Sequence, residues 1–335
     1  MKIKSLAPIA LAIVLLWSCV KEDAPQKNTN GPKCIQKNEM VIPSYKSYDE
    51  LLTIMTVAEE TGDLSNYPEI EKISAGLIAD NFFRGINPND FTNESELEEF
   101  FAKNKTYLDT IVDENNEVAI YPKWHDNSFR YVANIEGLFI VDGYVSRIFK
   151  HGIITKKQDS LDYLINLTEQ EAYNEMRPSS KGVPVPALNH WTCRTPLEWT
   201  TSTLMNRTTN GDNRLTIKLV SVFNRPGGMP HVHTSVKVTT EHYALWWWPE
   251  NHTMSCTGQV ITDRKTYATP AWDTSVSYVS EQKGGYIMDC FVNDTYTLDY
   301  EQEDVYHYWS YNLTATSPAV GSVSLIHIHQ YINNK

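Results

Sequence analysis

Residues 231–248 read HVHTSVKVTTEHYALWWW, and this stretch decides how the C-terminal half of the chain is interpreted. Apolar or β-branched residues recur at every second position from Val232 to Val238. Successive side chains of a strand point to opposite faces of a sheet, so this spacing places these residues on one face and the histidines on the other, more polar face. We therefore predict two strands here, at residues 231–240 and 242–248.

Further strand-like segments rich in Val, Thr, Tyr and Trp lie on both sides of this stretch. They cover residues 214–224, 253–262, 274–280, 286–292, 306–314 and 321–332. Turn-forming sequences separate most of them, including Asn210-Gly211-Asp212 and Pro226-Gly227-Gly228. Short strands with turns between them are typical of sandwiches and barrels. We expect residues 188–335 to form an all-β, β-sandwich-like C-terminal domain.

The N-terminal half has a mixed pattern. Ser47 and Glu50 have the spacing of a helix capping box, and the apolar run after them ends at Gly62. Further helices are predicted at residues 69–82, 95–108 and 161–167, and strands at 118–121 and 129–135. Asp142-Gly143 between two β-prone runs predicts a hairpin, because both turn positions need positive φ. We predict an α+β domain at residues 41–177, followed by a proline-rich linker at 178–187.

The first residues of the chain have the three parts of an export signal. Lys2 and Lys4 provide positive charge, residues 6–16 are mainly apolar, and Ser18 precedes Cys19. The apolar run is too short for a membrane-spanning helix, which needs about 20 residues. The stretch resembles a bacterial lipoprotein signal, which implies a signal peptide at residues 1–18, lipid on Cys19 and attachment to a membrane.

A second resemblance concerns the side of the membrane on which the protein lies. The residues after Cys19 read Val-Lys-Glu-Asp, similar to the acidic export signal of surface-exposed Bacteroidota lipoproteins. Residues 136–139, Glu-Gly-Leu-Phe, resemble the N-terminal halves of uncharacterised members of that group. The resemblance implies a cell-surface position on the outer membrane and no particular activity. Residues 19–40 are polar and contain prolines, so a flexible tether is expected there.

The charge of the chain narrows the choice of partners. The formal net charge is −12, and removal of residues 1–18 takes away two lysines and makes it −14. No cluster of Lys and Arg interrupts this balance, so we expect no nucleic-acid partner, because phosphate attraction requires a basic surface.

Four cysteines remain once Cys19 is assigned to lipid. An even number in an exported protein is compatible with two disulfides, and three connectivities are possible. Cys256 and Cys290 lie in strand-like segments of one region and form the preferred pair. Cys34 lies in the expected tether, where it has no obvious partner.

Two His-x-His pairs are the sharpest candidates for chemistry. They are His231 with His233, and His327 with His329. Each pair lies on one face of a strand, so four imidazoles would converge if the two strands were neighbours. Zinc, copper or nickel would suit such a site, and no other cofactor is expected. The alternative is that these are unrelated histidines facing solvent.

Aromatic residues form the second candidate. They gather at Trp246, Trp247 and Trp248 and, in another strand, at Tyr306, Tyr308, Trp309 and Tyr311. Flat rings on a sheet can stack on sugars or form a protein interface, so these residues are candidates for glycan or protein binding. Three consecutive tryptophans must face both sides of a sheet, so some of these rings are expected in the core.

These observations favour a non-enzymatic lipoprotein anchored at the cell surface, with a binding or structural role in its C-terminal β domain. The alternative is a metal-dependent hydrolase that uses the paired histidines.

Overall fold

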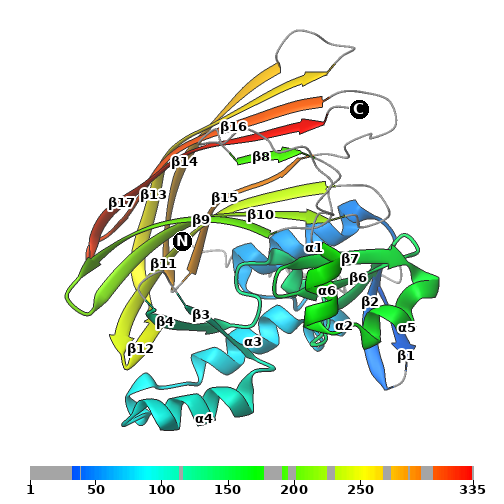
Figure 1. The fold of residues 1–335 in the computed structure, drawn as a ribbon, viewed down its shortest axis with the longest axis horizontal. Helices are drawn as coiled ribbons and strands as arrows, with labels where there is room; N and C mark the ends of the chain where they lie inside the picture. The colour runs from blue at the N-terminus through cyan, green and yellow to red at the C-terminus, as the bar shows by residue number, and fades with distance from the viewer. Residues whose placement is uncertain are drawn as a thin grey trace, which may run out of the picture. The chain divides into compact units, whose positions relative to one another are not determined.

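The computed structural model describes residues 32–37, 39–112, 116–176, 191–194, 201–224, 231–266, 273–285, 287–295 and 305–333. The expected signal peptide and Cys19 lie outside these residues. Residues 32–335 belong to one compact unit. Its described part contains three sheets, with helices beside the first and the second sheet, and strands dominate the C-terminal part (Figure 1).

The first sheet has the order β1-β2-β5-β6-β7. Its strands are β1 (Lys33–Lys37), β2 (Met40–Tyr45), β5 (Leu138–Val141), β6 (Tyr144–Phe149) and β7 (Gly152–Lys157). The expected tether at residues 19–40 is wrong at its end, because residues 33–37 form a strand. This strand pairs with β2 in an antiparallel register, and Ile35 packs against the core beneath the sheet.

Helices occupy much of the remaining N-terminal part. They are α1 (Tyr48–Thr61), α2 (Pro68–Glu71), α3 (Ala75–Arg84), α4 (Glu94–Asn104), α5 (Leu161–Asn166) and α6 (Glu169–Met176). The predicted start and end of α1 are confirmed. Ser47 accepts a hydrogen bond from the Glu50 amide, and Gly62 ends the helix with a φ of 65°. The helix predicted at residues 69–82 is instead divided between α2 and α3, with Ser74 capping α3.

The hairpin between β5 and β6 is also confirmed. Asp142 has a φ of 47° and Gly143 a φ of 76°, as a turn of this kind requires. The strand predicted at residues 129–135 is wrong, because this segment begins with the short 3-10 helix η2 (Ser128–Tyr131). Asn127 caps that helix, and the Asn134 side chain accepts from the amides of Glu136 and Leu138. These side-chain bonds take the place of a strand ladder.

The second sheet has the order β3-β4-β12-β11-β10-β9, and β15 also pairs with β11. Its strands are β3 (Leu108–Val112), β4 (Val118–Pro122), β9 (Thr201–Asn210), β10 (Asn213–Asn224), β11 (His231–Ala244), β12 (Trp246–Pro249) and β15 (Ile287–Thr295). Leu245, with a φ of 64°, separates β11 from β12, so the break lies later than the sequence predicted.

The third sheet has the order β14-β13-β16-β17-β8. Its strands are β8 (Trp191–Arg194), β13 (His252–Thr266), β14 (Asp273–Gly285), β16 (Val305–Ser317) and β17 (Gly321–Asn333). One hydrophobic cluster contains residues of both the second and the third sheet, including Leu215, Val238, Val260 and Leu313. The two sheets therefore share a core.

The predicted boundary at residues 178–187 does not separate two independent sheets. Strand β4 of the N-terminal half pairs in parallel with β12 of the C-terminal half, through Ala119 and Trp247. Val220 of β10 also belongs to the same hydrophobic cluster as Phe129 and Leu51. Pairing between segments far apart in the sequence joins the two halves into one body.

Candidate functional site

Strands β10 and β11 carry charged residues on one face and apolar residues on the other. Along β10, Arg214 and Lys218 alternate with Leu215 and Leu219. The antiparallel register places Arg214 opposite Glu241, and Lys218 opposite Lys237. This polar face consists of Arg214, Thr216, Lys218, His233, Ser235, Lys237, Thr239 and Glu241, all of which are buried. We call it the polar face of β10–β11.

Glu241 is the centre of one charged cluster on this face. Its carboxylate accepts from Arg214, with Nε–Oε2 at 2.6 Å and Nη2–Oε1 at 2.9 Å. Thr216 donates to it at 3.0 Å, and Tyr121 of β4 donates through its hydroxyl. Burial, followed by the negative charge of Glu241, raises the pKa of Tyr121 well above its ordinary value. The hydroxyl therefore keeps its proton and donates it in a hydrogen bond to Glu241. The cluster connects β4 to β10 and β11.

Trp247 and Glu117 extend this cluster toward the edge of the sheet. The Arg214 guanidinium lies 4.2 Å from the centre of the Trp247 ring, which is cation–π contact distance. Glu117 accepts from Arg214 Nη1 at 3.2 Å and from Trp247 Nε1 at 3.1 Å. Trp247 thus has both its ring face and its N–H engaged inside the protein.

A second cluster surrounds Asp126. Lys218 Nζ lies 2.9 and 3.0 Å from the two carboxylate oxygens, and His125 Nε2 lies 2.9 Å from Oδ1. Burial alone would raise the pKa of Asp126, but the positive partners and their hydrogen bonds outweigh it and hold that pKa below its usual range. Burial lowers the pKa of His125, whose ring stacks on Tyr121 at 3.9 Å. The cluster thus joins Lys218, Asp126 and His125 in one buried group of close polar contacts.

The turn that carries His125 and Asp126 is held in an unusual backbone conformation. Trp124 has a φ of 50°, a left-handed value that costs energy for a bulky residue. Asp109 of β3 stabilises the turn by accepting from the Trp124 amide at 2.8 Å and from Lys123 Nζ at 3.1 Å. Gly137, with a φ of 79°, lies against the Trp124 indole, where an added Cβ would come within 2.9 Å.

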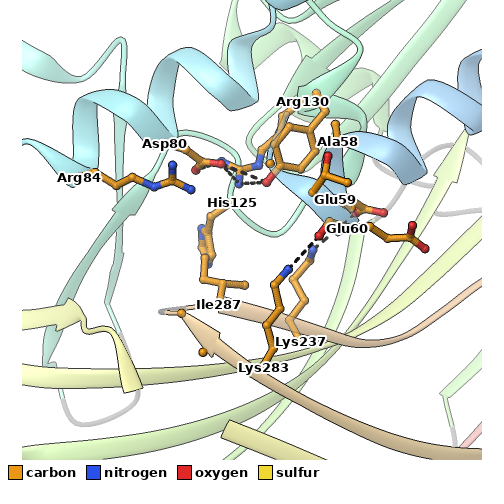
Figure 2. A pocket seen from close by; sticks show the side chains of 15 residues that line it. Ala58, Glu59, Glu60, Asp80, Arg84, His125, Arg130, Lys237, Lys283 and Ile287 are labelled. Carbon is orange, nitrogen blue, oxygen red and sulfur yellow. Dashed lines mark hydrogen bonds and ion pairs between the residues drawn. The ribbon is translucent and has the colours of Figure 1, made fainter. Parts of the chain in front are cut away.

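A cavity of about 170 Å³ opens beside this turn, and we call it the charged cavity (Figure 2). Four cationic side chains from four different elements line it, together with three carboxylates: Arg84, Arg130, Lys237, Lys283, Glu59, Glu60 and Asp80. Two buried cations have close acidic partners. Asp80 lies 2.9 Å from Arg130, and Glu59 lies 3.9 Å from Lys237. The Arg130 pair is also joined by the Tyr131 hydroxyl, 3.0 Å from Asp80.

A second cavity of about 660 Å³, the large cavity, lies next to the first between α1, β11, β14 and β15. Leu52 and Met55 of α1 and Met288 and Cys290 of β15 give it apolar walls. Its volume is within the range of small-molecule sites in proteins. The charged cavity and the large cavity share Glu59, Glu60 and Lys283, so the end of α1 and the end of β14 form their common wall.

The structure does not bring the predicted histidine pairs onto neighbouring strands. His231 and His233 lie on β11 of the second sheet, whereas His327 and His329 lie on β17 of the third. His233 is 2% exposed and contacts the edge of Phe129, so it is not a solvent-facing histidine either. The side chains of the other three lie outside the described part of the chain. Among the described side chains, no group of three or more metal-binding residues converges. The strand pairing removes the basis on which a shared metal site was predicted.

Several of the predicted aromatic binding residues belong to the core. Trp247 and Trp248 are 5% and 2% exposed, and Tyr311 is 1% exposed. Trp248 stacks on Phe91 with the ring centres 6.0 Å apart, in a hydrophobic cluster that also contains Leu97 of α4. Trp246 is half-buried against the same cluster. The side chains of Tyr306, Tyr308 and Trp309 lie outside the described part. The three buried rings cannot form a free binding surface, because protein atoms cover them.

The disulfide predicted between Cys256 and Cys290 is also wrong. Cys256 on β13 is a buried thiol, and the predicted Cys256–Cys290 disulfide is not present. Both residues lie in the core shared by the second and third sheets, where cysteine packs as a small apolar residue. Cys34 is a half-buried thiol on β1 rather than part of a tether.

The residues of the charged clusters were missed in the sequence. Their signal is the alternation of Arg214, Lys218, Lys237 and Glu241 with apolar residues, which resembles a strand with one face in solvent. Only the fold shows that the N-terminal half covers that face.

Within the described residues, no helix is long and apolar enough to cross a bilayer. Comparison with known proteins gives no match, either to a protein-family model or to a curated protein sequence.

Proposed function

We propose that the protein is a lipid-anchored binding protein of the outer bacterial cell surface. The anchor is proposed from the sequence, in which an export signal ends at Ser18 and Cys19 follows. The residues Lys21-Glu22-Asp23 support surface display by their resemblance to the acidic export signal. The proposed partner of the anchor is the outer membrane, and no nucleic acid is among the proposed partners.

Replacement of the lipid-bearing residue tests the anchor. Cys19→Ala should abolish incorporation of a labelled fatty acid and move the protein out of the membrane fraction, whereas Cys34→Ala should leave both unchanged. Protease treatment of intact cells should degrade the anchored protein if it faces outward. Fatty-acid labelling that survives in Cys19→Ala would contradict the proposed lipidation.

The main support for the binding role is the pair of adjoining cavities that lies where α1 meets β11, β14 and β15. We propose that the second and third sheets form a β-sandwich, supported by their common hydrophobic core. Such a body would hold one side of the ligand site rigid while α1 provides the other. The proposed site thus lies away from the buried aromatic residues.

A cavity-filling variant tests this placement. A panel of sugars, organic acids and amphipathic molecules is screened for an increase in melting temperature. Any increase found should disappear in Leu52→Trp, because Leu52 lines the large cavity, and persist in Val276→Trp, whose site on β14 is exposed. Retention of the effect in Leu52→Trp would place the ligand elsewhere and contradict the proposed site.

A further inference from the structure

The two adjoining cavities differ in chemistry, and together they describe one kind of ligand. They meet at the wall formed by Glu59, Glu60 and Lys283. We call the combined space the α1–β14 cleft. One end of the cleft has an apolar wall within a partly polar lining, and the other end carries four cations and three carboxylates. A ligand that fills both ends must itself have two different ends.

The apolar end is built mainly from α1 and β15. Met55 and Met288 are buried, and Leu52 is half-buried beside them. Val279 of β14 faces the same space. Methionine side chains are flexible and adapt to apolar molecules of different shape. Burial of an alkyl chain against such walls is favourable by about 0.8 kcal/mol per methylene group.

The charged end gathers its cations from α3, η2, β11 and β14. Arg130 and Lys237 are held in the wall by Asp80 and Glu59. Arg84 and Lys283 are exposed residues that enter the cavity from different sides (Figure 2). Lys283 Nζ donates to the Glu60 carbonyl at a long 3.4 Å, which leaves this flexible side chain able to turn toward a ligand. Arginine and lysine are the residues that bind carboxylates and phosphates most strongly.

We propose that the α1–β14 cleft binds an amphipathic organic anion, with its acidic head beside Lys283 and Arg84 and its apolar body along Leu52, Met55 and Met288. This proposal rests on the binding role proposed above and adds the class of ligand. Asp80 and Glu59 are compatible with an anion here, because both carboxylates already face cations of the wall. Glu60 and Glu281 also line the cleft, and both are exposed residues whose carboxylates can turn toward solvent.

Calorimetric titration of the purified full chain with decanoate and its shorter homologues tests both ends of the cleft. Each methylene removed should weaken binding about fourfold, which corresponds to about 0.8 kcal/mol. Decanol has the same chain length without the charge and should bind at least about tenfold more weakly. That factor corresponds to about 1.4 kcal/mol, the strength of one good charged hydrogen bond.

Substitution of the exposed lysine separates the head from the tail. Lys283→Gln should weaken decanoate binding about tenfold and leave decanol binding unchanged, since only the anion contacts the amino group. Lys72→Gln makes the same charge change at an exposed position away from the cleft and should alter neither. Leu52→Gln should reduce the dependence on chain length and leave the preference for the anion over the alcohol intact.

Three results would overturn the proposal: equal binding of acetate and decanoate, equal binding of decanol and decanoate, or no binding of any member of the series. The titrations do not depend on the lipid anchor, so they should give the same result with Cys19→Ala. Failure of the proposed membrane anchoring can therefore be distinguished from failure of the proposed ligand class.

Discussion

The two faces of strand β10 pack against opposite kinds of environment. Leu215, Ile217 and Leu219 pack in the hydrophobic core shared with the third sheet. Arg214, Thr216 and Lys218 lie on the polar face of β10–β11, which packs against the N-terminal half, and we call this contact the charged junction. Both sets are buried. The apolar face stabilises by area and tolerates many arrangements, whereas the charged face stabilises only when each group meets its partner. We infer that the core provides stability and that the junction fixes how the two halves meet.

The largest expected effect comes from removal of one charge from the junction. Glu241→Ala leaves Arg214 and the Tyr121 hydroxyl buried without their acceptor, and should lower the free energy of unfolding by about 3–5 kcal/mol. Urea denaturation followed by tryptophan fluorescence measures it. Glu250→Ala removes an exposed carboxylate paired with His252, and its effect should be about 1 kcal/mol or less. Similar losses in the two variants would mean that the buried cluster contributes no more than a surface pair.

An apolar deletion next to Arg214 in the chain sharpens the contrast. Leu215→Ala should lower the free energy of unfolding by about 2–5 kcal/mol through lost burial and the cavity that remains. Leu215→Met, which nearly preserves volume, should cost less than about 1.5 kcal/mol. No substitution of similar volume is expected to replace Glu241 without loss, because its position requires a negative charge and correctly oriented hydrogen-bond acceptors. A tolerated Glu241→Gln would contradict that distinction.

The two faces should also differ in their response to pH. The unfolded chain protonates His125 near pH 6.5, but burial lowers the pKa of this residue in the folded protein. Below about pH 6.5 the unfolded chain binds a proton at His125 that the folded protein does not bind. The free energy of unfolding should therefore fall as the pH drops, by at most about 1.4 kcal/mol per pH unit. His125→Gln should reduce this slope, and an unchanged slope in that variant would contradict the assignment to His125.

A further loss is expected at lower pH. The pKa of Asp126 is held below its ordinary value in the folded protein, so its ion pair with Lys218 contributes stability above about pH 4. That contribution disappears as the pH falls further and the carboxylate takes up a proton. Unchanged stability between pH 7 and pH 3 would contradict a charged junction, since neither group would then be titrating with folding.

The smallest effect is expected at the start of α1, outside both regions. Ser47→Ala removes the oxygen that accepts from the Glu50 amide and should cost about 1 kcal/mol. Ser47→Asp keeps an acceptor at the same place and should cost almost nothing. Thermal unfolding of both variants supplies the comparison, and an equal loss in the two would show that the cap is not responsible.

Local features of the fold were predictable from the sequence because neighbouring residues cause them. The Ser47–Glu50 cap, the Gly62 terminus and the Asp142-Gly143 turn each depend on a few adjacent positions. Most strands of the C-terminal half were predicted for the same reason, from alternating apolar residues and the turns between them. The strand predicted at residues 129–135 was wrong, because the side chains of Asn127 and Asn134 accept hydrogen bonds from backbone amides that would otherwise pair with a neighbouring strand.

The candidate site was not predictable in this way. The pairing of β4 with β12 joins segments that are distant in the sequence, and no local pattern specifies it. The two histidine pairs lie on different sheets, and the sequence could not show this, because two-residue spacing reports a shared face but not which strands are neighbours. The charged residues of β10 and β11 were visible, but their burial depends on the whole N-terminal half.

A double-mutant cycle on Arg214 and Glu241 tests the charged junction most directly. Arg214→Met, Glu241→Leu and the double variant are compared with the original protein by urea denaturation. If the pair matters through mutual compensation, each single change costs about 3–5 kcal/mol, and the double variant costs less than the sum of the two, giving a coupling of at least about 2 kcal/mol. Additive losses would contradict the account, because the two charges would then contribute independently of each other.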